Sequence, residues 1–180
     1  MTFRMGRKGT AAVELALISP LLMVLFAGMI DFGRVYQQEI ELSGAVASAA
    51  EYALVNVASV SSGNAATLAA AISGIVANSN GGAWADVTVT VNNGATSIVT
   101  GGVTTSSGTA ANADLCWCPT GSPPNWIWGA SVTCGVSCAG GNLAGKFITI
   151  AGSHAFTAIF ASYGLIGNTA LAQNMIVQAK

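Results

Sequence analysis

The sequence predicts an α+β fold in which a long N-terminal helix, half apolar and half amphipathic, packs on a small antiparallel sheet. Residues 11–30 form an apolar run in which Glu14 is the one charged side chain. At a rise of about 1.5 Å per residue, a helix of this run spans roughly 30 Å, the thickness of a bilayer's hydrocarbon core. Apolar residues at helical spacing continue to about residue 58, and alternating segments typical of strands follow. Packing of the helix on a sheet would bury its amphipathic half.

The composition is apolar and poor in charge. Of the 180 residues, 52% are hydrophobic and 7% are charged, against about 25% charged in an average soluble domain. The net charge is −1 and no basic patch could neutralise phosphates, which excludes a nucleic-acid-binding protein. After Tyr52 the charged side chains are Asp86, Asp114, Lys146 and Lys180. Such a Ser-, Thr- and Gly-rich surface favours an extracytoplasmic or assembled protein over a cytosolic enzyme.

Motifs of the common enzyme classes are absent from the sequence. It contains no nucleophile elbow, no phosphate-binding loop and no zinc-protease helix, and after Tyr52 it has no close pair of acids. His154 is the only histidine and has no acid or cysteine near it in the sequence. We therefore expect a protein that is not an enzyme, with no catalytic residue, no cofactor and no metal ligand.

The residues before the apolar run indicate its orientation in a membrane. Arg4, Arg7 and Lys8 precede the run, so the positive-inside rule places the N-terminus in the cytoplasm and the rest of the chain outside. A cleaved secretory signal would need a small-x-small site soon after the run. The nearest candidate, residues 45–47, lies far beyond Ile30 and across four charges. We therefore predict a retained membrane anchor with a single span.

Glu14 is the unusual residue of the apolar run. Burial of a lone carboxylate in a membrane costs several kcal/mol in order-of-magnitude terms, so a partner for it is expected. The simpler interpretation is that its charge favours the positive N-terminus of the helix, which is worth about 0.3–1 kcal/mol.

The chain divides into a membrane helix at residues 10–31, its amphipathic continuation at 32–60, and an extracytoplasmic α+β domain at 61–180. Within the continuation, the small residues Ala45, Ala49 and Ala53 form a ridge that allows close helix packing, either on the chain's own domain or on other subunits. The expected elements of the domain are a helix at 65–78 capped by Asn64, a strand at 86–91, a turn at 92–94, a return strand at 97–99, a loop at 101–112, and strands at 146–151 and 171–177.

Four cysteines lie in residues 115–140 as two close pairs, Cys116 with Cys118 and Cys134 with Cys138. The pairs have C-x-C and C-x3-C spacings, which differ from the C-x2-C spacing typical of zinc sites. A location outside the cytoplasm also favours disulfides over metal. A bridge within Cys116-Trp-Cys118 would be strained, so two cross-links between the pairs are expected. Two connectivities fit: Cys116–Cys138 with Cys118–Cys134, or Cys116–Cys134 with Cys118–Cys138.

Three tryptophans, Trp117, Trp126 and Trp128, lie in the same cysteine-rich region. If they are exposed on the loop, they would form a contact surface. If they pack together, they would fill a small core.

The N-terminal sequence resembles that of a known family. The segments Gly9-Thr-Ala-Ala-Val-Glu-Leu-Ala-Leu, Pro20-Leu-Leu and Asp31-Phe-Gly-Arg-Val-Tyr36 closely resemble the N-terminus of TadE-like proteins. These are the minor pilins, or pseudopilins, of tight-adherence (Flp-type) pilus systems. Leu15 stands where the family commonly has an aromatic residue, and Asp31 where it commonly has Glu.

The resemblance implies a pilin-like fold and a pathway of processing and assembly. Residues 1–9 would be a leader that a prepilin peptidase removes between Gly9 and Thr10. The subunit would stay in the bacterial inner membrane, with its C-terminal domain periplasmic, until a pilus assembly platform extracts it into a filament with other pilin subunits. Glu14 would neutralise the new amine of Thr10 on a neighbouring subunit and set the axial register. The function implied is a structural subunit that supports adhesion and biofilm formation at the cell surface; the alternative is a membrane-anchored binding module that uses the Trp/Cys loop without a filament.

Overall fold

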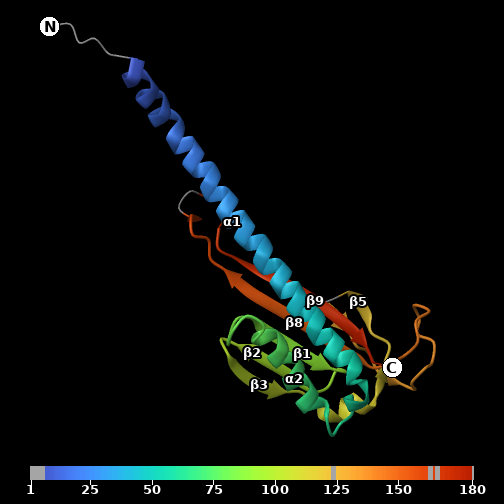
Figure 1. Cartoon of the computed structure of the whole chain (residues 1–180). Coiled ribbons are helices and arrows are strands. Elements are labelled where there is room, and N and C mark those ends of the chain that lie inside the picture. Colours follow the sequence, from blue (N-terminus) through green and yellow to red (C-terminus); the bar gives the residue numbers. More distant parts are fainter. Residues whose placement is uncertain (1–6, 123–124, 162–163, 165–166, 180) are drawn as a thin grey trace, which may run out of the picture. The chain divides into compact units, whose positions relative to one another are not determined.

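The computed structural model describes residues 7–122, 125–161, 164 and 167–179; residues 1–6 of the expected leader lie outside these ranges. In chain order the elements are α1 (Arg7–Val55), the 3₁₀ helix η1 (Val57–Ser59), α2 (Ala65–Ala77), β1 (Asp86–Val91), β2 (Thr96–Thr100), β3 (Val103–Ser107), the 3₁₀ helix η2 (Ala110–Asp114), β4 (Cys116–Trp117), β5 (Thr120–Ser122), β6 (Asn125–Ile127), β7 (Ser131–Val132), β8 (Phe147–Phe156) and β9 (Thr169–Gln178) (Figure 1).

These elements group into two compact units. The first comprises Met1–Gln38 and Phe156–Thr169, and the second comprises Glu39–Ala155 and Ala170–Lys180. Helix α1 contributes to both units, because it runs without interruption for 49 residues and continues through Pro20. The predicted long helix packed against a small antiparallel sheet is therefore confirmed.

The second unit contains the hydrophobic core. The part of α1 in this unit buries one stripe of small and branched residues: Leu42, Ala45, Val46, Ala49, Ala50 and Ala53. Helix α2 adds Leu68, Ile72 and Val76 to the same core. The alanine ridge predicted from the sequence thus packs within the chain's own core.

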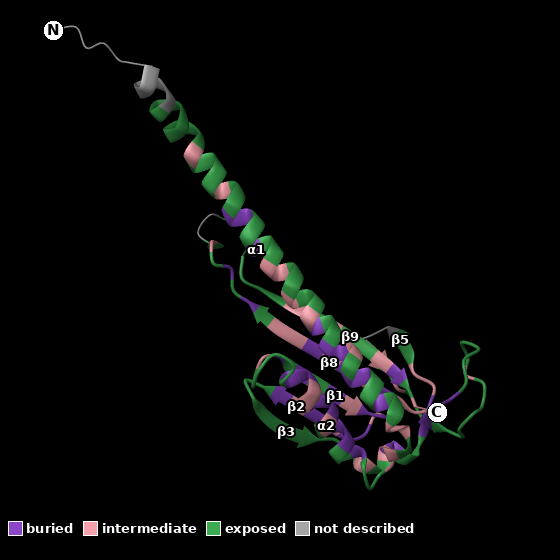
Figure 2. Ribbon diagram, in the orientation of Figure 1, coloured by how far each residue is buried: buried purple, intermediate pink, exposed green. Residues whose placement is uncertain are grey.

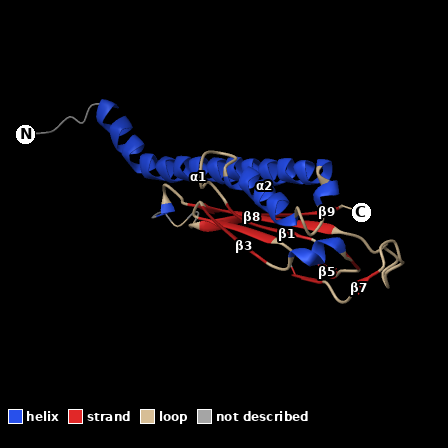
Figure 3. Ribbon diagram, turned by 90° about the horizontal axis from the view of Figure 1, so that it is seen from below, coloured by secondary structure: helices blue, strands red, loops and turns tan. Residues whose placement is uncertain are grey.

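One sheet has the strand order β3-β2-β1-β8-β9, and the pairings of β1 with β2, β1 with β8 and β2 with β3 are antiparallel. Strand β1 alternates as predicted: Val87, Val89 and Val91 are buried, whereas Thr88 faces away from the core. Figure 3 shows α2 on one side of this sheet. The other face carries the threonine side chains.

Two local predictions were wrong. The segment expected to be a loop at 101–112 contains strand β3, which turns back from β2 through Gly101 and Gly102 at φ 55° and 80°. All five residues of β3 are exposed, so no buried face imposes the apolar alternation that would reveal an edge strand. Asn64 precedes α2, but its side chain forms no capping hydrogen bond.

The side chain of Asn92 stabilises the turn between β1 and β2. The residue adopts φ 55° and is fully buried. Its side-chain Nδ2 lies within hydrogen-bonding distance of three carbonyl oxygens, and its Oδ1 accepts from the N–H of Phe147 at 3.1 Å. The three carbonyls belong to Asn112, Ala113 and Leu115. One buried amide therefore joins the β1–β2 turn, η2 and the start of β8.

Two charged side chains form hydrogen bonds with the connection between α1 and α2. Hydrogen bonds from the side chain and backbone of Ser62 hold the pKa of Asp114 below its ordinary value, and the charge of Lys146 acts in the same direction. The Lys146 ammonium donates to the carbonyl of Val60 at 2.8 Å. These two charges thus stabilise the domain's own structure.

At Gly152 on β8, side chains of both helices lie close to the backbone of the sheet. A Cβ atom at this position would lie 3.2 Å from Val46, 3.3 Å from Val76 and 3.4 Å from Leu42. These neighbours come from both helices, so a side chain at Gly152 would push α1 and α2 away from β8.

We therefore expect Gly152→Ala to destabilise the domain by about 1–3 kcal/mol through overpacking. Gly44→Ala is the matched control, because a Cβ on this helical glycine meets nothing within 4 Å; it should stabilise the helix by up to about 1 kcal/mol. Chemical denaturation of the full chain in detergent micelles measures both. Equal effects of the two substitutions would contradict the packing described for Gly152.

Candidate functional sites

The N-terminal half of α1 exposes its apolar side chains. Its large exposed residues include Leu15, Leu17, Ile18, Leu21, Met23, Leu25, Phe26, Met29, Ile30 and Phe32. The most apolar window within Ala12–Val55 has a mean hydropathy of 2.2, and 6% of it is buried (Figure 2). By length and composition this helix can cross a membrane. A continuous apolar surface of this kind needs a bilayer or other apolar helices around it.

The predicted processing and register residues lie at the start of this surface. Gly9 and Thr10 belong to the first turns of α1. Glu14 follows Thr10 by four residues and is exposed among apolar side chains. No side chain among the described residues pairs with its charge.

Asp31 lies at the other end of the apolar run and is 2% exposed. Its two carboxylate oxygens accept hydrogen bonds from the backbone N–H groups of Ile159 and Phe160, at 3.0 and 2.9 Å. Arg34, one turn further along the helix, approaches the same carboxylate at 3.7 Å. The carboxylate thus serves as the acceptor of two neighbouring backbone amides.

Arg34 holds the same segment at two further points. Its guanidinium donates to the carbonyl of Thr157 at 3.4 Å and lies 5.4 Å from the ring centre of Phe156. Together, Asp31 and Arg34 fasten residues 156–160 to α1, and we call this arrangement the Asp31 clasp. Its only signal in the sequence is a pair of opposite charges three residues apart, directly after the apolar run.

The cysteines form two disulfides, Cys116–Cys134 and Cys118–Cys138. This is one of the two connectivities that the spacing left open. Strands β4 and β7 pair beside the first bridge, with Cys116 opposite Val132. Among the described residues, no group of three His, Cys, Asp or Glu side chains could hold a metal ion.

The three tryptophans of the cysteine region pack on one another instead of standing apart. Trp117 is 6% exposed and meets Trp128 edge to face. Trp126 contacts Trp128 and Phe147 in the same way, with ring centres 5.5 and 5.3 Å apart. Most of their surface therefore fills a local core, while Ile127 between them is 68% exposed.

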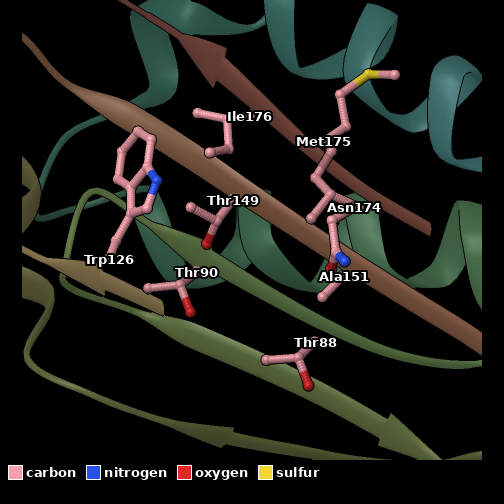
Figure 4. Close-up of a pocket in the computed structure, with 9 residues that line it drawn as sticks. Thr88, Thr90, Trp126, Thr149, Ala151, Asn174, Met175 and Ile176 are labelled. Atoms are coloured by element: carbon pink, nitrogen blue, oxygen red, sulfur yellow. The ribbon is translucent and has the colours of Figure 1, made fainter. Parts of the chain in front are cut away.

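A shallow uncharged pocket of about 190 Å³ lies beside Trp126, on the face of the sheet that carries the threonines. Figure 4 shows Trp126 next to Thr90 and Thr149, with Thr88 and Asn174 further along. No charged side chain is among the residues that line it. Hydroxyl groups, an amide and one aromatic ring could contact a neutral polar ligand.

Replacement of Asp31 tests whether the Asp31 clasp holds residues 156–160 on α1. Asp31→Ala leaves two amides without acceptors, at a cost of about 1–3 kcal/mol for each. Hydrogen exchange at Ile159 and Phe160 should then accelerate by about tenfold for every 1.4 kcal/mol lost. Glu51→Ala removes the same charge from an exposed position of α1 and should leave both amides protected. Unchanged exchange in Asp31→Ala would show that the clasp does not hold the segment.

Comparison with protein families supports the resemblance in the sequence. The family model described as TadE-like protein matches residues 9–51. This range contains Gly9, Glu14, the apolar run and the Asp31 clasp residues of α1, and it ends before α2 and the sheet. Neither the comparison with curated proteins nor that with solved structures gives a match. Residues 9–51 are therefore similar to TadE-like proteins, a structural family associated with tight-adherence pili.

Proposed function

We propose that this protein is a pilin-type structural subunit, a minor pilin or pseudopilin of a tight-adherence pilus. The observation that carries the proposal is the exposed apolar half of α1, which bears Glu14 and lies within the residues similar to TadE-like proteins. Such a helix can rest in a bilayer before assembly and in a bundle of like helices afterwards. Both environments shield the same side chains from water.

In this proposal, the chain acts in four parts. Residues 1–9 are a leader, 10–31 the membrane and filament-core helix, 32–60 its amphipathic continuation, and 61–180 the extracytoplasmic domain. A prepilin peptidase cuts between Gly9 and Thr10, and an assembly platform then transfers the subunit from the inner membrane to a surface filament. The filament supports adhesion and biofilm formation.

The role proposed for Glu14 follows from its electrostatics. Cleavage creates an ammonium group on Thr10 at the membrane end of the helix. In a bundle of apolar helices, an unpaired carboxylate or ammonium is costly, and a pair formed between neighbouring subunits removes both penalties. Because the pair forms only at one axial offset, it selects the register of the subunits. Thr10 and Glu14 of a single chain lie one turn apart on the same helix.

A second function from another class is a membrane-anchored binding module that does not enter a filament. It is favoured by the uncharged pocket beside Trp126, which offers hydroxyl, amide and aromatic contacts to a neutral ligand. The two functions share the membrane anchor and the domain. They differ in whether the leader is removed.

Intact mass of the protein, extracted from membranes with and without an active prepilin peptidase, tests the proposal. Loss of Met1–Gly9 only in the presence of active peptidase is the expected result. An uncut chain in both cases would contradict the pilin function and leave the anchored module. A mature chain starting at Ser48 would identify a cleaved secretory signal and contradict both.

Glu14→Ala tests the assembly step separately. This substitution should leave cleavage intact but deplete the subunit from sheared surface filaments, because the Thr10 ammonium loses its partner. Glu51→Ala, which removes a carboxylate from an exposed site of the same helix, should assemble normally. Normal recovery of the Glu14→Ala chain in filaments would contradict the register role.

A further inference from the structure

The connection between β8 and β9 has an unusual composition. Residues 156–169 contain no charged side chain and include Ala158, Ile159, Phe160 and Ala161 in succession. Ile159 is 61% exposed although it is fully apolar. Charged and polar residues normally dominate an exposed loop between strands, so this composition calls for an apolar neighbour.

Side chains pair with four backbone groups of this segment, at residues 157–160. The amide of Ala158 donates to Asn168 Oδ1 at 3.2 Å, and the next two amides donate to Asp31. The carbonyl of Thr157 accepts from Arg34. A loop in water does not need such pairing, whereas backbone groups at membrane depth lose several kcal/mol each when they are unsatisfied.

The Asp31 clasp also fixes the position of the segment along α1. Asp31 is the last residue of the proposed span at 10–31, and the amides of Ile159 and Phe160 lie within 3.0 Å of its carboxylate. The segment is therefore held at the depth where the apolar run ends.

Burial on α1 continues from this point toward the middle of the span. Ala27 is 3% exposed and Gly28 is also buried, while Phe26 and Met29 beside them are 62% and 70% exposed (Figure 2). Ala27 lies about 6 Å from Asp31 along the helix axis. The covered strip thus lies inside the proposed span.

We propose that residues 158–161 form a second membrane-contacting element, which lies in the outer interface of the bilayer beside α1 with the Ile159 side chain in lipid. The Asp31 clasp anchors it there and pairs its amides. This inference rests on the proposed membrane span of α1. The subunit would then leave the membrane by withdrawing a loop as well as a helix.

Nitroxide labels on single introduced cysteines test the proposal in the full chain, reconstituted in phosphatidylethanolamine–phosphatidylglycerol vesicles. All four native cysteines are in disulfides, so each introduced thiol is the one free site. Ile159→Cys probes the loop, Leu17→Cys the span, and Val103→Cys the surface of β3; these side chains are 61%, 76% and 67% exposed. The readout is the accessibility of each label to oxygen, which partitions into lipid, and to a water-soluble nickel chelate.

The proposal predicts a high oxygen-to-nickel ratio at Ile159 and Leu17 and a low ratio at Val103. Asp31→Ala should lower the ratio at Ile159 to that of Val103, and an unchanged ratio would overturn the anchoring by Asp31. A low ratio at Ile159 with a high one at Leu17 would overturn the loop inference and leave the membrane span intact. Poor access of both reagents to Ile159 would mean that a second copy of the chain covers it, which also overturns lipid contact. A low ratio at Leu17 would overturn the span itself.

Discussion

The structure depends on how one continuous helix is shielded from water along its whole length. From Glu39 onward, α1 buries its apolar stripe in the core of the second unit, against α2 and the sheet. Before that point, the same helix exposes Leu17, Met23 and Phe26 with little protein around them. The protein itself shields the second half of the helix, and in the proposed function lipid or neighbouring helices shield the first half. Its proposed function as a filament subunit follows from this division.

In the proposed topology, Asp31 and Arg34 lie where the apolar environment of α1 meets water. A buried carboxylate costs free energy unless donors surround it, and here two backbone amides and a guanidinium approach it. The resemblance to TadE-like proteins rests partly on these two residues, and the clasp gives them a physical role: they fasten the β8–β9 connection to the helix. Glu14 at the other end of the run has no such partner within the described chain, which sets its role apart from that of Asp31.

Sequence patterns predicted those elements whose periodicity is imposed by a buried face. The alternation in β1 and the stripe in α2 follow directly from their contact with the core. Strand β3 was missed because both of its faces are exposed. The Asp31 clasp was missed because its partners, Ile159 and Phe160, lie more than a hundred residues away in the chain, and no local pattern encodes such a contact. The disulfide pairing stayed open because spacing alone does not determine which cysteines meet.

The central claim is that α1 passes from an apolar environment to water near Asp31. Labelling of single cysteines with a membrane-impermeant thiol reagent, added from the periplasmic side of intact inner membranes, tests it directly. Met29 and Tyr36 form a matched pair, because they are 70% and 68% exposed in the isolated chain. The account predicts that Tyr36→Cys is labelled, whereas Met29→Cys is protected until detergent is added. Equal labelling of both positions before detergent would contradict it.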